Sequence, residues 1–247
     1  MYNKIKYLVK RLLPAKMIFR MEPFLRLTLY PFYIGRRYRC NICNSSLRKF
    51  VRQGDDLLCP VCGSLPRTRR LWELLNSEYF GDNKKVLDFS PSRSLYRKLK
   101  KYPGIHYFST DRSGDFISDF QYDITNIDVG TATFDFIICY HILEHVIDDR
   151  RAMHELFRVL KDDGICIIQT PFKEGEIYEN WSVKTDDERL VHFGQRDHVR
   201  IYAVDGFRTR LSDAGFHVLI RKFEAPEGNK HGFSSDETVL VCTKPRL

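Results

Sequence analysis

Short apolar runs alternate with amphipathic stretches from residue 84 to the end of the printed sequence. The apolar runs predict strands at 86–89, 105–110, 134–140, 165–170, 217–223 and 238–242. Apolar residues at helical spacing predict helices at 95–102, 148–160 and 202–214. Apolar strands that alternate with helices are typical of a parallel sheet covered on both faces. We therefore expect an α/β chain with a Rossmann-like doubly wound sheet.

Polar residues stand where several of these predicted strands end. Asp88 and Asp111 lie at the ends of the first two strands, and Asp123 follows further along the chain. Tyr140 and His141 lie at the end of the strand at 134–140. Because ligands of such sheets bind beyond the carboxyl ends of the strands, these residues are candidates for a binding site.

The chain of 247 residues carries a net charge of +8, but this charge is concentrated at one end. Residues 1–39 hold ten basic residues and one acid, so the remaining 208 residues have a net charge of −1. A near-neutral body argues against the basic stripe that a nucleic-acid partner requires.

With 43% hydrophobic residues the chain can bury a core, and no apolar run approaches the ~20 residues of a membrane-spanning helix.

The basic N-terminal segment has the pattern of an amphipathic helix. Ile5, Leu8, Val9, Leu12 and Leu13 share one helical face, while Lys4, Lys6, Lys10 and Arg11 occupy the other. Such a helix either lies on an anionic membrane surface, here through residues 4–30, or packs against the body of the protein. RNA is a third candidate partner for this segment. No secretory signal precedes it, so we expect a cytoplasmic protein, with a peripheral position at the inner face of the membrane if the helix binds lipid.

Four of the seven cysteines form two C-x2-C pairs. The pairs are Cys40 with Cys43 and Cys59 with Cys62, and 15 residues separate them. Two such pairs can supply the four thiolates that a structural zinc ion prefers, and the residues around Gly54 predict a short hairpin between them. We therefore expect a zinc ribbon at 40–65 with a structural Zn²⁺. Cys139, Cys166 and Cys242 lie in apolar runs and are expected in the core.

The longest recognisable motif runs from Phe134 to Phe172, FDFIICYHILEHVIDDRRAMHELFRVLKDDGICIIQTPF. Together with the acids at the strand ends, it resembles the class I S-adenosylmethionine-dependent methyltransferases of the type 11-like group. The resemblance covers roughly residues 84–247. Together with the basic N-terminal pattern and the cysteine pairs, it divides the chain into four segments, namely a basic helical extension (1–39), the zinc ribbon (40–65), a connector helix (66–83) and a methyltransferase domain (84–247).

The resemblance also implies roles for individual residues in binding S-adenosylmethionine. Asp111 would hold the ribose hydroxyls, Asp123 with Ile124 the adenine, and Tyr140 with His141 would flank the methionine portion. Asp88 opens a loop that is glycine-rich in the family, whereas this chain has Ser90, Ser92 and Ser94 at the three glycine positions. The serine hydroxyls either contact the amino-acid end of the cofactor, or the loop is too crowded to bind it, since serine lacks glycine's easy access to positive φ.

A polar insertion of about 30 residues separates the strand at 165–170 from the helix predicted at 202. Loops of this length in a compact domain are usually functional or disordered. It contains His192 and His198 as candidate bases for taking a proton from an acceptor hydroxyl, with His141 and His145 as rivals. The other candidates bind or orient the acceptor: Gln195, Asp197 and Arg200. In the alternative interpretation, Asp197, His198 and Arg200 bond to one another and only hold the loop in place.

These features favour a cytoplasmic methyltransferase that acts on a hydroxyl or carboxyl of a small molecule or glycan, lipid-linked if the N-terminal helix binds a membrane. An RNA methyltransferase is the alternative within enzymes. A zinc-ribbon binding protein with a degenerate methyltransferase fold is the non-enzymatic alternative, and the three serines of the first loop are its main support.

Overall fold

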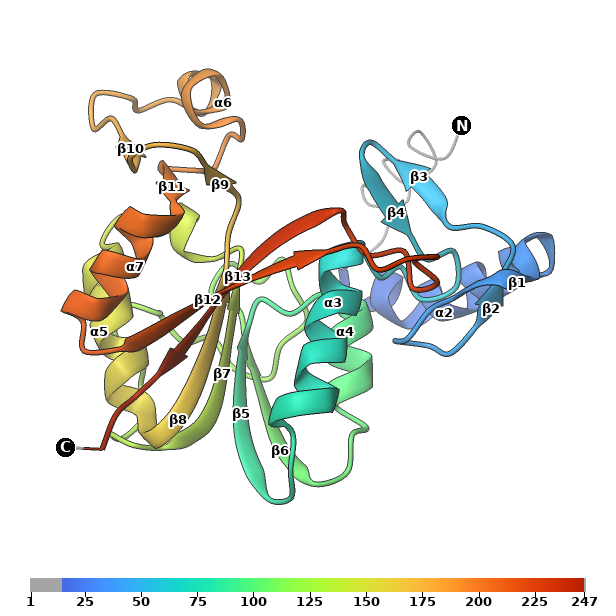
Figure 1. Ribbon diagram of the computed structural model, residues 1–247, viewed down its shortest axis with the longest axis horizontal. Coiled ribbons are helices and arrows are strands. Elements are labelled where there is room, and N and C mark those ends of the chain that lie inside the picture. Colours follow the sequence, from blue (N-terminus) through green and yellow to red (C-terminus); the bar gives the residue numbers. More distant parts are fainter. Residues whose placement is uncertain (1–14, 247) are drawn as a thin grey trace.

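A six-stranded sheet forms the centre of the computed structural model, which describes residues 15–246 (Figure 1). Its strands, in spatial order, are β12 (His217–Glu224), β13 (Asp236–Thr243), β8 (Leu160–Gln169), β7 (Phe134–Tyr140), β5 (Lys84–Phe89) and β6 (Ile105–Thr110). The pairs from β8 to β6 are parallel, whereas β13 is antiparallel to both of its neighbours. The Rossmann-like α/β prediction is confirmed. Only β13 departs from the parallel direction, because a hairpin joins it to β12.

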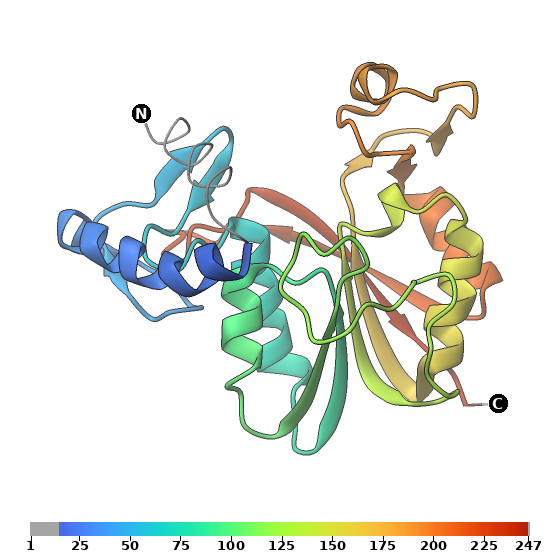
Figure 2. The ribbon, with the colours of Figure 1, turned by 180° about the vertical axis from the view of Figure 1, so that it is seen from behind.

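Helices cover both faces of this sheet. One face packs against α5 (Asp149–Val159) and α7 (Val204–Asp213), and the other against α3 (Pro66–Leu74) and α4 (Arg93–Leu99) (Figures 1 and 2). Along β7, Ile137 and Cys139 contribute to the first core and Phe136 and Ile138 to the second. This alternation follows from the two-residue period of a strand. It explains why the run from Phe136 to Cys139 is apolar on both faces of the strand.

The N-terminal part of the described chain forms α2 (Ala15–Leu29), η1 (Tyr30–Tyr33) and β1 (Ile34–Arg39). The helix α2 lies against α4, where the Arg97 guanidinium donates to the Phe19 carbonyl (2.7 Å) and to the Glu22 carboxylate (3.0 Å). The amphipathic helix expected for residues 4–13 lies outside the described residues. Within residues 15–246, no helix is both long and apolar enough to span a bilayer.

The segment with the four paired cysteines folds into two small antiparallel ladders. β1 pairs with β2 (Ser46–Leu47), and β3 (Val51–Gln53) pairs with β4 (Asp56–Leu58). The hairpin expected around Gly54 is present, and Gly54 takes a positive φ of 60° in its turn. This module is followed by α3 and by a short helical turn, η2 (Leu75–Tyr79).

A single buried side chain, Arg69 on α3, ties the cysteine module to the rest of the protein. Its guanidinium donates to the carbonyls of Leu57 (2.9 Å) and Ser64 (2.7 Å) in the module. It also donates to the carbonyls of His231 and Gly232, both at 2.6 Å, in the connection between β12 and β13. The Arg69 side chain thereby joins two segments that are more than 160 residues apart in the sequence.

The insertion expected as a polar loop is instead a small folded unit. It comprises β9 (Phe172–Lys173), β10 (Tyr178–Glu179), α6 (Asp186–Phe193) and β11 (Arg200–Ala203), with strand order β10-β11-β9. Thr185 and Glu188 form a capping box at the start of α6, and Gly194 ends it with a φ of 80°. Strands of two to four residues are too short to produce a periodic pattern. The helix predicted from residue 202 begins at Val204, because Tyr202 and Ala203 pair with β9.

Arg200 holds this inserted unit against the short helix η3 (Leu143–His145). Its side chain is fully buried, and its Nε donates to Glu179 (2.6 Å). Its remaining donors reach the carbonyls of Leu143 (2.9 Å), Ile147 (2.8 Å) and Val146. This burial corrects the expectation that Arg200 binds or orients the acceptor, because the side chain is fully buried and four of its N–H donors bond to the protein. The alternative bonding of Arg200 with Asp197 and His198 is not found in the structure either.

Candidate functional site

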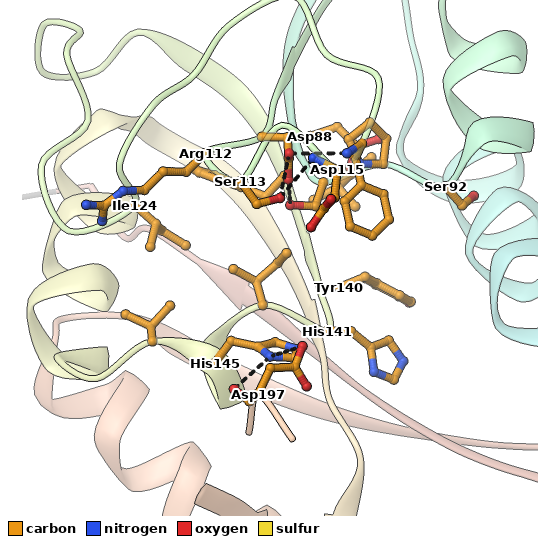
Figure 3. Close-up of a pocket in the computed structure, with 18 of the residues that line it drawn as sticks. Asp88, Ser92, Arg112, Ser113, Asp115, Ile124, Tyr140, His141, His145 and Asp197 are labelled. Atoms are coloured by element: carbon orange, nitrogen blue, oxygen red, sulfur yellow. Dashed lines mark hydrogen bonds and ion pairs between the residues drawn. The ribbon is translucent and has the colours of Figure 1, made fainter. Parts of the chain in front are cut away.

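The carboxyl ends of β5, β6 and β7 open into a cavity of about 1280 Å³. Its walls come from the loops after these three strands, from η3, from the inserted unit and from the start of α3. Figure 3 shows the side chains that point into it. The volume exceeds what a single small ligand needs, so it can accommodate a nucleoside cofactor and an acceptor together.

Two turns with left-handed backbone shape the floor of the cavity. Ser90, after β5, has a φ of 46°, and its backbone N–H donates to the Thr110 carbonyl (2.7 Å). His141, after β7, has a φ of 56°, and its N–H donates to the Gln169 carbonyl (2.8 Å). Ser90 therefore adopts the positive φ that glycine provides in the related family, at a cost of about 1–2 kcal/mol for a residue with a Cβ. The loop is formed despite its serines.

The serine side chains of this loop have separate tasks. The Ser90 hydroxyl donates to Asp111 Oδ1 (2.7 Å), and Ser92 caps α4 by accepting from the Leu95 N–H (3.4 Å). Ser94 lies within α4 and is buried. Ser90 and Ser92 line the cavity, as does Asp88, which precedes them.

Asp88 is a buried acid held in its neutral form. It is 1% exposed, and the Tyr107 hydroxyl donates to its Oδ2 at 2.8 Å. Burial raises the pKa of Asp88 to about 8, and the Tyr107 hydrogen bond only partly opposes this shift. At neutral pH the Asp88 side chain is therefore both a hydrogen-bond donor and an acceptor at the base of the cavity.

Asp111 presents a firmly positioned carboxylate at the end of β6. It is 3% exposed, and it accepts hydrogen bonds from the Ser90 hydroxyl, from the Ser113 hydroxyl (2.9 Å) and from the Phe116 N–H (3.2 Å). A carboxylate has about four acceptor positions, so one remains for a ligand. Two of its three donors are hydroxyls, which can rotate away when a ligand hydroxyl takes their place.

Asp123 lines the same cavity from the loop between β6 and β7. It accepts from the backbone N–H (2.9 Å) and hydroxyl (2.8 Å) of Thr125, and it pairs with Arg112 (2.6 Å). Partial burial acts to raise its pKa, but the Thr125 hydrogen bonds and the Arg112 charge together lower it. Ile124 beside it is buried at 7% exposure and supplies an apolar wall. The structure thus brings Asp111, Asp123 and Ile124 to one cavity, as predicted for a nucleoside site.

Three histidines gather at the other end of the cavity, and one predicted histidine does not. His141, His145 and His198 line it, with Gln195 and Asp197 beside them. His145 Nδ1 lies 3.2 Å from both the carbonyl and the carboxylate of Asp197, as Figure 3 shows. His192 lies on α6 outside the cavity lining, where its Nδ1 bonds to the Tyr178 hydroxyl (2.7 Å).

Two of these histidines sit in different electrostatic surroundings. His141 Nδ1 lies 3.2 Å from Glu144 Oε1, and Glu144 is 1% exposed. Burial lowers the pKa of His198, and the neighbouring His145 lowers it further, while the Glu144 and Asp197 carboxylates act to raise it. The rings of His145 and His198 meet edge to face with centroids 4.6 Å apart.

Part of the cavity wall was not foreseen from the sequence. Asp56 of β4 and three residues of α3, Arg67, Thr68 and Leu71, line the cavity opposite the inserted unit. Arg67 and Asp56 form a half-exposed ion pair at 3.4 Å. No local pattern marks these residues, because their position depends on how the cysteine module packs against the sheet.

The four paired cysteines converge on one point. Cys40 Sγ lies 3.6 Å from Cys62 Sγ, and Cys43 Sγ lies 3.8 Å from Cys59 Sγ. Zinc–sulfur bonds of ~2.3 Å in a tetrahedron separate the sulfurs by ~3.8 Å, whereas a disulfide requires about 2.05 Å. The arrangement therefore fits a four-thiolate zinc site and not two disulfides.

The charge around the cysteines supports the same interpretation. Arg69 is buried beside this cluster, and within the described part of the chain it forms no ion pair with a carboxylate. Burial lowers the pKa of Arg69, and the nearby Cys40, Cys59 and Cys62 act to raise it. A buried cation requires a compensating anion, and a zinc ion with four thiolates carries a net charge of −2.

Comparisons with known proteins agree with this geometry. A family model described as a methyltransferase domain matches residues 66–220, more than half of the chain. The search of curated proteins found no match.

Three solved structures show the fold. A SAM dependent methyltransferase from Archaeoglobus fulgidus has a TM-score of 0.53 at 16% identity, covering 72% of this chain and 92% of that one. A chain from a Haloferax volcanii complex between the Trm112 methyltransferase activator and a methyltransferase has a TM-score of 0.52 at 15% identity, covering 72% and 89%. Phosphoethanolamine N-methyltransferase 2 of Haemonchus contortus, solved with S-adenosyl-L-methionine, has a TM-score of 0.52 at 11% identity, covering 72% and 52%.

The raised pKa of Asp88 predicts a specific pH dependence of stability. Between its ordinary pKa of 3.8 and its folded pKa of about 8, the folded chain retains a proton that the unfolded chain releases. The free energy of unfolding contributed by this group therefore falls as pH rises through that window, by at most ~1.4 kcal/mol per pH unit. Asp88→Asn mimics the neutral acid, so urea unfolding at pH 5 and pH 8 should show a smaller loss of stability than in the wild type. The exposed Asp205→Asn should leave the loss unchanged, and an equal loss in Asp88→Asn would contradict the assignment.

The cysteine cluster predicts that Cys59→Ser loses one equivalent of zinc relative to the wild type. Without the metal the buried Arg69 loses its compensating anion, so we expect the variant to be destabilised by several kcal/mol. Metal content by mass spectrometry and thermal unfolding measure these two effects. Cys166→Ser, in the core away from the cluster, serves as the control that destabilises without releasing zinc. Equal zinc content in the wild type and Cys59→Ser would contradict the prediction.

Proposed function

Because this chain belongs to the class I S-adenosylmethionine-dependent methyltransferases, we propose that it methylates a hydroxyl or carboxyl oxygen of a small molecule or glycan. The observation that carries this proposal is that the two ends of the cavity are lined by chemically different side chains. Carboxylates suited to a nucleoside occupy one end, and histidines suited to moving a proton occupy the other. The cysteine cluster would hold a structural zinc ion, since four thiolates leave no open position for a ligand.

The residues at the first end fit the cofactor. Asp111 would accept from the ribose hydroxyls at its remaining acceptor position, and charged acceptors form the stronger hydrogen bonds. Asp123 would bind the adenine amino group, with Ile124 against the base. Arg112 is well exposed and can move aside when adenine approaches Asp123. Ser90 and Ser92 would face the methionine portion together with Asp88, and Tyr140 would flank it.

His141 is the residue best placed to take the acceptor proton. It lines the cavity directly after β7, and its Nδ1 is held near the buried Glu144 carboxylate. S-adenosylmethionine, when bound, would supply a methyl group on a sulfonium whose sulfur keeps the electron pair of the broken carbon–sulfur bond. His141 would accept the proton of the acceptor hydroxyl as its oxygen becomes methylated. A base of this kind contributes about 10²–10⁴-fold to rate.

Gln195 and Asp197 would contact the acceptor from the inserted unit, and Arg67 from α3 would contact it from the opposite wall. His198 belongs to the same end of the cavity. His192 has no role in this proposal, because it does not line the cavity and its Nδ1 bonds to the Tyr178 hydroxyl.

This assignment predicts different defects in two variants. Asp111→Ala should weaken S-adenosylhomocysteine binding by at least ~10-fold in calorimetry, since it removes a charged acceptor. His141→Ala should keep that affinity and lose at least ~100-fold in methyl transfer, measured with tritiated S-adenosylmethionine and fractionated cell extract. His154→Ala, exposed on α5, is the matched control.

Label in the RNA fraction would favour the RNA methyltransferase instead, and no cofactor binding by the wild type would favour the non-catalytic alternative.

A second part of the proposal concerns location at an anionic membrane. The outer face of α2, η1 and β1 exposes large apolar side chains, among them Phe24 at 74%, Leu27 at 58%, Phe32 at 66% and Ile34 at 58%. Exposed arginines 20, 36, 37 and 39 lie in the same segment. Apolar side chains with arginines around them match the interface of an anionic bilayer, so this segment would hold the protein at a membrane that carries a lipid-linked acceptor.

Lipid binding predicts that the protein sediments with vesicles containing phosphatidylserine and not with neutral ones. Phe24→Ser should weaken this binding by at least ~10-fold, because burying a phenylalanine contributes ~1.5–3 kcal/mol. Leu219→Ser removes a comparably exposed side chain from β12 and should have no effect. Equal sedimentation of all three proteins, or none with either vesicle, would remove the membrane from the proposal.

A further inference from the structure

We propose that Glu144, His145 and His198 form a second metal site, open to the cavity, for a divalent transition-metal ion. Its role in catalysis rests on the proposed function, but its existence does not. The three side chains come from two segments that are far apart in the sequence, since Glu144 and His145 belong to η3 and His198 follows α6.

The ligand atoms are already close together. One ligand atom from each of the three residues lies within 4.8 Å of the others. Metal–ligand bonds of ~2.1 Å place ligand atoms about 3–4 Å apart, so a small rotation of the side chains completes the site. Glu144 and His198 are buried, at 1% and 4% exposure, which keeps water from competing for these ligands.

The Glu144 carboxylate supplies a second and independent observation. Both of its oxygens are buried, and in the described chain neither accepts a hydrogen bond. His141 Nδ1 lies 3.2 Å from Oε1, but this contact lacks the geometry of a hydrogen bond. A buried carboxylate that accepts no hydrogen bond is costly, and a cation held next to it would remove this cost. Since His141 approaches Oε1, Oε2 is available to the metal.

The surroundings of His145 are those of a metal ligand. Its Nδ1 can donate to the Asp197 carbonyl and carboxylate, both at 3.2 Å, which leaves Nε2 for the ion. Metal-binding histidines commonly donate their second ring nitrogen to a carboxylate or carbonyl in this way. Asp197 would therefore be a positioning residue for His145 and not a ligand.

Two imidazoles and one carboxylate leave coordination positions unfilled, in contrast to the four cysteines. Catalytic zinc sites have three protein ligands of this kind, and the same donor set binds other divalent transition metals. His145 and His198 line the cavity, so the open position faces the acceptor end. An oxygen of the acceptor would bind there, and the ion would lower the pKa of that hydroxyl and favour its deprotonated form. This narrows the acceptor to a molecule whose reacting hydroxyl or carboxyl can bind a divalent cation.

Cobalt(II) separates the two sites because their ligands differ. Full-length protein stripped of metal is titrated with Co²⁺, and the absorption spectrum is recorded at each addition. Coordination by thiolates produces an intense near-ultraviolet charge-transfer band, whereas histidine and carboxylate ligands produce only weak visible bands. We expect two equivalents in the wild type, one with the thiolate band and one without it. Cys59→Ser should lose the first and keep the second.

Glu144→Gln and His198→Ala should each weaken the second equivalent by at least ~10-fold and leave the thiolate band unchanged. His154→Ala is the control for removing a histidine outside the cavity. In Glu144→Gln, His198→Ala and His154→Ala the thiolate band reports folding, and in Cys59→Ser circular dichroism reports it, so His198→Ala remains informative if Glu144→Gln does not fold.

The outcomes separate this inference from the proposed function. Only one equivalent of Co²⁺ in the wild type, with the thiolate band, overturns the second site even if S-adenosylhomocysteine binds. A second equivalent that persists in both Glu144→Gln and His198→Ala also overturns it. Two equivalents with the expected losses establish the site even if no cofactor binds, in which case the proposed methyl transfer fails on its own.

Discussion

The site depends on the chain turning sharply at the carboxyl ends of two parallel strands. Ser90 after β5 and His141 after β7 both take a left-handed backbone conformation, and each N–H is held by the carbonyl of a neighbouring strand. Strain of this kind persists only where the surrounding structure overdetermines it, and it occurs most often at functional sites. These turns place the Ser90 hydroxyl on Asp111 and bring the His141 side chain to the opposite end of the same cavity.

Two buried arginines complete the cavity by holding its outer walls. Arg69 joins the cysteine module to the β12–β13 connection, and Arg200 joins the inserted unit to η3. In both cases one guanidinium donates to several backbone carbonyls. A planar group with five donors suits this task better than a lysine. These two walls of the cavity are therefore positioned by charged side chains that bond to the protein itself.

The pKa values of the ionisable side chains that line the cavity are shifted in different directions. At one end, burial raises the pKa of Asp88 to about 8, while Thr125 and Arg112 lower the pKa of Asp123. At the other end, the buried Glu144 lies near three histidines, and burial lowers the pKa of His198. Shifted pKa values of this kind are found most often at functional sites.

The amino-acid sequence alone determined the fold class, the strands of the sheet and the cysteine pairs, because these depend on local periodicity and spacing. The acids at the strand ends were also found this way, since parallel strands deliver their carboxyl ends to one edge. The sequence did not show that Arg200 is buried, that His192 lies outside the cavity, or that Arg67 and Asp56 line it. Those positions depend on packing between segments far apart in the chain. The meeting of His198 with Glu144 and His145 likewise exists only in the tertiary structure, because more than 50 residues separate them and no local pattern records which partner a side chain will meet.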